Sequence, residues 1–68
     1  MASLIQLTGA YREQYADLLA AADGLSVAAV ERELATRFAR EEQLGISARE
    51  TILRLARDIR SGVWPGRR

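Results

Sequence analysis

The segment 44–62 constrains the fold most, because it contains the end of one helix, a tight turn and the whole of the next helix. Gly45 can adopt the left-handed conformation that ends a helix without a Cβ penalty. Ser47 precedes Glu50 by three residues, the spacing of a capping box in which the Glu50 carboxylate reaches back to the serine. A glycine and a proline then mark the far end. We therefore expect a helix over about residues 48–61.

Two faces of this helix differ in chemistry. The apolar side chains at helical spacing predict a core face: Ala48, Ile52, Leu55, Ala56 and Ile59. A second face has one leucine among three arginines: Arg49, Leu53, Arg57 and Arg60. Two interpretations of that face stay open. Its arginine stems either cover the leucine in a solvated surface, or the face is a basic, partly apolar surface that contacts a partner.

Two longer helices are expected before this one. Apolar residues at helical spacing predict the first over about 4–23, with Gly9 as a point where its first turn can fray or kink. Ser26 is an N-cap signal for the second, which we expect over about 26–44. Pairs of opposite charge four residues apart are expected on the helix surfaces. They are Glu33–Arg37, Arg37–Glu41, Glu50–Arg54 and Arg54–Asp58.

No strand pattern or repeat interrupts these helices, so the sequence predicts an all-α fold, a three-helix bundle. We expect one helical domain over 1–62 and a short, non-helical basic tail over 63–68. Trp64 lies in this tail, where the following proline favours extended backbone. It either folds over the end of the bundle or is an exposed anchor for a partner protein.

The chain is too short to bury a large core, so we expect it to self-associate. Proteins of 68 residues usually need disulfides, a metal or oligomerisation for stability. The sequence has no cysteine and no histidine, which excludes disulfides and the usual zinc sites. Oligomerisation remains, and a homo-oligomer is the prediction.

The net charge of +1 hides an uneven distribution along the chain. Residues 1–25 have one arginine against three carboxylates, a net charge of −2. Residues 46–68 have six arginines against two carboxylates, a net charge of +4. A basic end of this kind can bind phosphates or the acidic end of a second copy.

The residues that most enzymes need are missing. There is no histidine, cysteine or lysine, and no glycine-rich phosphate-binding loop. We therefore expect a protein that is not an enzyme and that holds no metal and no cofactor. No apolar run approaches the ~20 residues of a membrane span, and no signal peptide pattern is present. A cytoplasmic protein with no membrane partner is the expectation.

One stretch follows a known family pattern: Leu44-Gly45-Ile46-Ser47, then Arg49-Glu50-Thr51-Ile52 and Arg54. This stretch of about residues 44–57 resembles the turn and the recognition-helix start of bacterial helix-turn-helix transcription regulators. The resemblance implies that the helix 48–61 enters the major groove of DNA. The contact candidates that it implies are Ser47, Arg49, Glu50 and Arg57.

Two hypotheses of function follow. The first is a small, non-enzymatic protein–protein interaction module with a regulatory or adaptor role, whose partner is another protein or a second copy. Its contact residues are Leu53, Arg57, Arg60 and Trp64. The alternative is a small helix-turn-helix DNA-binding regulator that uses the helix 48–61.

Overall fold

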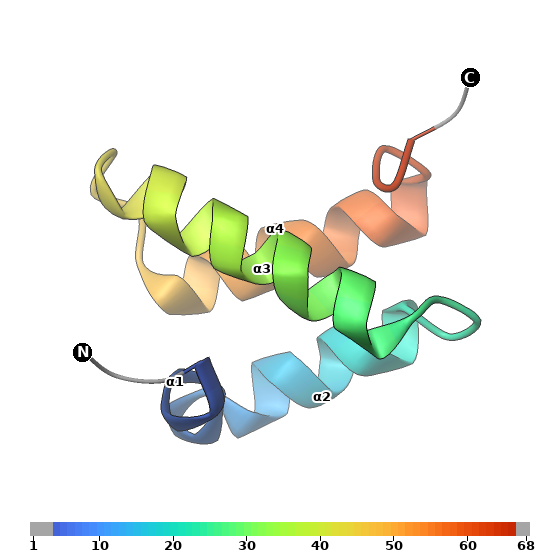
Figure 1. The fold of residues 1–68 in the computed structure, drawn as a ribbon, viewed down its shortest axis with the longest axis horizontal. Coiled ribbons are helices and arrows are strands. Elements are labelled where there is room, and N and C mark those ends of the chain that lie inside the picture. The colour runs from blue at the N-terminus through green and yellow to red at the C-terminus, as the bar shows by residue number, and fades with distance from the viewer. Residues whose placement is uncertain (1–3, 67–68) are drawn as a thin grey trace.

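The computed structural model describes residues 4–66, which form four α-helices and no strand. They are α1 (Leu4–Ala10), α2 (Arg12–Ala21), α3 (Val27–Glu42) and α4 (Ala48–Ser61) (Figure 1). The expected all-α fold is confirmed. The number of helices differs from the expected three, because the first predicted helix is divided into two.

The division falls at Tyr11, two residues after the glycine that we expected to weaken the helix. Tyr11 has φ −122° and ψ 45°, and its N–H donates to Thr8 O at 3.1 Å rather than to the carbonyl one residue earlier. The Tyr11 side chain packs against the core. Figure 1 looks nearly along α1 while α2 runs across the view, so the chain changes direction here. The prediction of one continuous helix over 4–23 is therefore wrong, because core packing of Tyr11 overrides the helical periodicity.

Both predicted serine N-caps are confirmed. The Ser26 hydroxyl accepts from the Ala29 N–H at 3.3 Å, and α3 begins at the next residue. The Ser47 hydroxyl accepts from the Glu50 N–H at 3.2 Å, and α4 begins at the next residue. Each serine satisfies a backbone donor that would otherwise lack a helical partner. The bounds of α4 match the prediction.

The turn between α3 and α4 is closed by a Schellman motif. Gly45 has φ +79°, the left-handed conformation that a side chain would strain. Its N–H donates to Glu42 O at 3.0 Å, and the Ile46 N–H donates to Glu41 O at 3.0 Å. The chain therefore reverses within a few residues and returns α4 alongside α3.

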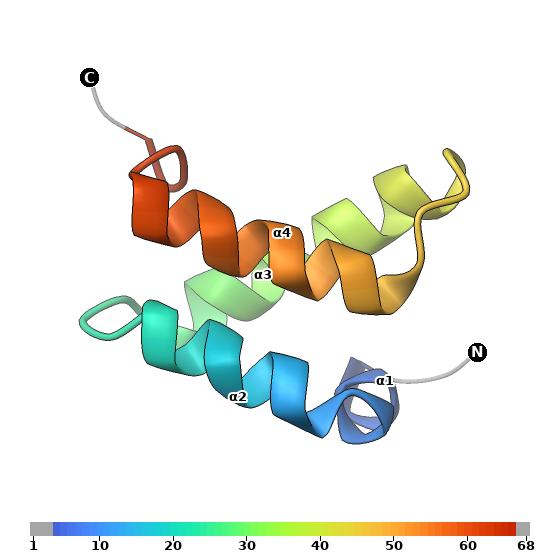
Figure 2. The same cartoon turned by 180° about the vertical axis from the view of Figure 1, so that it is seen from behind.

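The central helix of the fold is α4, which packs against both α2 and α3. Figure 2 shows α2 and α4 side by side with their C-terminal ends at the same end of the molecule, while α3 crosses behind them. The buried apolar core has side chains that are 0–5% exposed: Leu18, Ala22, Val30, Leu34, Ile52, Leu55 and Ala56. Three of these come from α4, so this helix supplies the largest share of the core.

A buried arginine joins α3 to α4. The Arg37 side chain is only 10% exposed, and it donates from Nε to Glu33 Oε2 and from Nη1 to Asp58 Oδ2, each at 2.8 Å. Burial alone would lower the pKa of Arg37, but its bonds to Glu33 and Asp58 raise the pKa above its usual value. Arg37 therefore stays charged and links α3 to α4 through a residue 21 positions away in the sequence.

A second polar contact supports the same interface. The Thr51 hydroxyl, which is almost fully buried, lies 3.0 Å from Glu41 Oε1 and 3.1 Å from Ser47 O. Within residues 4–66, no buried side-chain nitrogen or oxygen lacks a hydrogen-bond partner. The α3–α4 interface thus combines apolar core residues with buried polar groups that are hydrogen-bonded.

Replacing Arg37 by methionine should lower the free energy of unfolding by about 2 kcal/mol. The substitution leaves Glu33 and Asp58 close together without their cation. The loss is smaller than that of a fully buried pair because both carboxylates keep roughly a fifth of their surface, 23% and 22%, in solvent. Urea unfolding followed by circular dichroism measures it.

Arg57→Met is the matched control, because Arg57 is exposed and has no ion pair within residues 4–66. Its effect should stay within about 0.5 kcal/mol. Equal effects of the two substitutions would show that Arg37 does not hold α3 to α4.

Candidate interaction surfaces

The outer face of α4 is the surface formed by Arg49, Leu53, Arg57 and Arg60, whose central residue Leu53 points about 100° around the helix from the buried Ile52. All four residues are exposed, and Leu53 is 37% exposed. The spacing of 3.6 residues per turn places Arg49 and Arg57 one turn before and one turn after Leu53. The structure therefore brings together the basic, partly apolar stripe that the sequence predicted.

Ion pairs divide the arginines of α4 into two groups. Arg60 pairs with Asp17 of α2, and Arg54 Nε lies 3.4 Å from Glu50 Oε2. Arg49 and Arg57 form no ion pair in the described part of the chain. Arg60 thus links two helices, while the guanidinium groups of Arg49 and Arg57 have no carboxylate partner among the described residues.

Two of the residues implied by the helix-turn-helix resemblance are occupied by contacts within the helix. Ser47 uses its hydroxyl to cap α4. The Glu50 carboxylate binds Arg54 instead of reaching back to Ser47, so only half of the expected capping box forms. Arg49 and Arg57 are the two implied residues whose side chains make no such contact.

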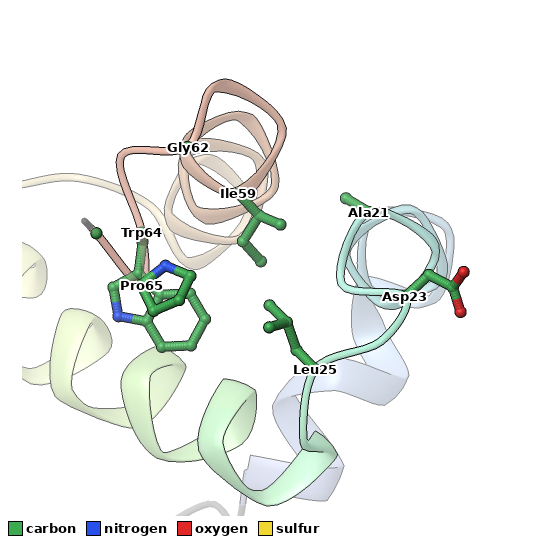
Figure 3. A pocket seen from close by; sticks show the side chains of 8 residues that line it. Ala21, Asp23, Leu25, Ile59, Gly62, Trp64 and Pro65 are labelled. Carbon is green, nitrogen blue, oxygen red and sulfur yellow. The ribbon is translucent and has the colours of Figure 1, made fainter. Parts of the chain in front are cut away.

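A second candidate surface, the tail groove, lies where the chain leaves α4. It has a volume of about 400 Å³. Its lining residues are Ala21, Asp23, Leu25, Ile59, Gly62, Trp64, Pro65 and Gly66 (Figure 3). The Trp64, Leu25 and Ile59 side chains point toward one another across it, whereas the Asp23 carboxylate points away. The groove is therefore mainly apolar.

Trp64 folds back over the end of the bundle. Its side chain is half-buried and packs against the core, and its backbone N–H donates to the backbone carbonyl oxygen of Asp58 at 3.2 Å. Of the two alternatives left open for Trp64, the structure shows the packed one. The part of the indole that stays exposed lines the tail groove.

The α3–α4 turn lies at the opposite end of the molecule from the C-terminal end of α4 (Figure 2). A third candidate surface, the turn groove, is lined by residues of this turn. It has a volume of about 250 Å³ and is lined by Leu7, Phe38, Glu42, Ile46, Ser47, Ala48 and Thr51. Leu44, in the same turn, is 70% exposed. Sequence analysis missed this groove, because α1, α3 and α4 each contribute to it and no local pattern links them.

The pKa of Tyr15 is shifted well away from the ordinary value of a tyrosine. Its hydroxyl donates to Glu31 Oε2 at 2.7 Å, which joins α2 to α3. Burial first, and then the hydrogen bond and charge of Glu31, raise the pKa of Tyr15 to about 12. The phenol is therefore protonated at neutral pH and stabilises the fold as a donor. This contribution persists below pH 10, the ordinary pKa of tyrosine, and is lost as the pH rises from there toward 12.

The described residues show neither a metal-ligand cluster nor a helix able to cross a membrane. Residues 4–66 contain no cluster of three or more acidic side chains that could hold a metal ion. Among the helices described, none combines the length and the apolar character needed to cross a membrane. Exposed arginines, exposed leucines and open apolar grooves remain.

No family model matches the sequence, and no curated protein and no solved structure is detectably similar to it. The candidate surfaces therefore rest on the residues and their geometry alone.

Proposed function

We propose that this protein is a small, non-enzymatic protein–protein interaction module with a regulatory or adaptor role in the cytoplasm. It binds its partner through the outer face of α4. The observation that carries this proposal is Leu53, an exposed leucine placed between two arginines, Arg49 and Arg57, that have no ion pair in the described chain. The helix that presents them is held rigid by the core on its other side.

The chemistry of this face selects an acidic, amphipathic partner. Arg49 and Arg57 are eight residues apart, about 12 Å along the helix axis, with Leu53 midway between them. A partner helix that places an apolar side chain on Leu53 and carboxylates about two turns apart would satisfy all three residues. Each exposed ion pair contributes about 0.2–1 kcal/mol, and burial of the 37% of Leu53 that is exposed contributes about 0.5–1 kcal/mol. Leu53 is therefore the apolar anchor at the centre of the contact, comparable in energy with each ion pair, and the arginines also set the orientation and association rate.

A library of helical peptides displayed on phage and selected on the immobilised protein tests this proposal. Selection should enrich peptides with acidic residues about two turns apart around an apolar residue. Leu53→Asp should weaken the binding of the enriched peptides by about tenfold or more, because it removes the anchor and adds a like charge. Fluorescence anisotropy of the labelled peptides gives the affinities.

Val27→Asp is the matched control, because Val27 is also an exposed apolar residue but lies on α3. It should leave peptide affinity unchanged. Peptides that bind the Leu53 and Val27 variants equally well would show that the outer face of α4 is not the binding surface.

DNA binding is the second candidate, and the same two arginines favour it. Arg49 and Arg57 lie on the exposed face of the helix that follows a glycine turn and a serine cap, the arrangement that resembles a helix-turn-helix. Guanidinium groups without a carboxylate partner are suited to DNA phosphates or guanine edges. In this hypothesis α4 lies in the major groove, and Arg49 and Arg57 contact the DNA phosphates or guanine edges.

Anisotropy of a labelled random-sequence duplex, titrated with the protein at low and at moderate salt, tests the DNA hypothesis. Binding should weaken steeply with salt, and Arg49→Ala or Arg57→Ala should each reduce the salt slope by about one. Arg32→Ala serves as the control, because Arg32 is an exposed, unpaired arginine on α3. Absence of binding at low salt would remove this candidate.

A further inference from the structure

The turn groove offers an apolar surface and one carboxylate, which is enough for Leu53 and one of the two arginines on the outer face of α4. Apolar side chains from three helices and the turn line it, among them Leu7, Phe38 and Ile46. Glu42 is its only carboxylate and forms no ion pair in the described chain. The groove therefore offers an apolar cavity beside a single unpaired negative charge.

The outer face of α4 has the complementary features on the same molecule. Leu53 projects an apolar side chain, and Arg49 and Arg57 flank it with unpaired positive charge. The groove volume of about 250 Å³ leaves room for one leucine side chain. An exposed apolar residue between cations thus matches an apolar groove beside an anion, in shape and in charge.

We propose that the partner of the outer face of α4 is the turn groove of a second copy of this chain. Leu53 of one copy enters the groove between Phe38 and Ile46 of the next, and Arg49 or Arg57 pairs with Glu42. This inference rests on the proposed function, since it uses the same face and names its partner. The acidic N-terminal part and the basic C-terminal part of the chain support association between copies.

A chain cannot make this contact with itself. Thr51, which lines the groove, and Leu53 are two residues apart on α4 and therefore point about 200° apart around the helix. The contact joins two different surfaces, so each bound copy still presents one unused face and one unused groove. Association of this kind is head-to-tail and gives dimers and short chains rather than a closed pair. One leucine and one exposed ion pair make it weak and concentration-dependent.

The tail groove has no comparable match. The Asp23 carboxylate points away from it (Figure 3), and two further arginines follow Gly66 in the sequence. Charge therefore selects the turn groove as the binding site for an arginine-flanked leucine.

Mixing two variants tests the head-to-tail contact directly. Leu53→Asp removes the apolar contact of the outer face of α4 and leaves the turn groove unchanged. The double variant Glu42→Arg with Ala48→Phe reverses the charge of the turn groove and fills it. This second variant leaves the outer face of α4 unchanged. Both changes lie at or near the surface, and circular dichroism verifies that each variant is folded. Sedimentation velocity at high micromolar concentration and low salt measures the size of the complexes.

The wild-type protein should form dimers and longer chains, and each variant alone should associate at least about tenfold more weakly. An equimolar mixture should give 1:1 dimers and nothing longer, because only one productive contact exists between the two variants. A wild-type protein that stays monomeric, a Leu53→Asp variant that associates as the wild type does, or a mixture without heterodimers would each overturn the inference. If the wild type is monomeric but acidic peptides still bind the outer face of α4, this inference fails and the proposed function stands.

Discussion

The burial of one side of α4 between α2 and α3 is the interaction on which the rest of the structure depends. Ile52, Leu55 and Ala56 are completely covered, and each large apolar side chain contributes about 1.5–3 kcal/mol when removed from water. No other helix in residues 4–66 supplies as many core residues. Packing on α4 therefore positions α2 and α3, and the two interfaces differ in chemistry.

The polar contacts between α3 and α4 fix the position at which the two helices cross around a small core. A chain with so few buried apolar residues could let α3 slide along α4, since apolar packing alone is tolerant of shifts. Arg37 of α3 must meet Asp58 of α4, and Thr51 of α4 must meet Glu41 of α3, so sliding one helix along the other would break both contacts. The charges of Arg37, Glu33 and Asp58 are paired with one another. Arg49 and Arg57, which lie on another side of α4, have no ion pair among the described residues. The same helix thus separates a structural side from a side that is suited to binding.

Local signals made part of this structure predictable. The bounds of α4 and both serine caps follow from short-range patterns, because a cap involves residues only three positions apart. The break at Tyr11 was not predicted, since it depends on where that side chain meets the core. Gly9 marked a weak point two residues before the break, but the local sequence does not show that the chain changes direction there.

Contacts between distant residues account for the remaining differences. The expected Glu33–Arg37 pair forms, but Arg37 meets Asp58 instead of Glu41, and Glu41 accepts from Thr51. A spacing of four residues predicts which side chains can meet within one helix, whereas the crossing of two helices decides which of them do. The outer face of α4 was predicted because it lies within a single helix. The two grooves were not, because each combines residues from several elements.

Native-state amide hydrogen exchange measured by NMR tests the central claim, that α4 is the core helix and its outer face is a rigid surface. The slowest-exchanging amides should belong to α4 around Ile52 and Leu55, and those of α1 should exchange much faster. The amides of Leu53 and its neighbours should be protected together with the core residues of the same helix, although their side chains face solvent. Exchange in α4 as fast as in α1 would contradict the account, because α4 would then be neither the centre of the fold nor a rigid binding surface.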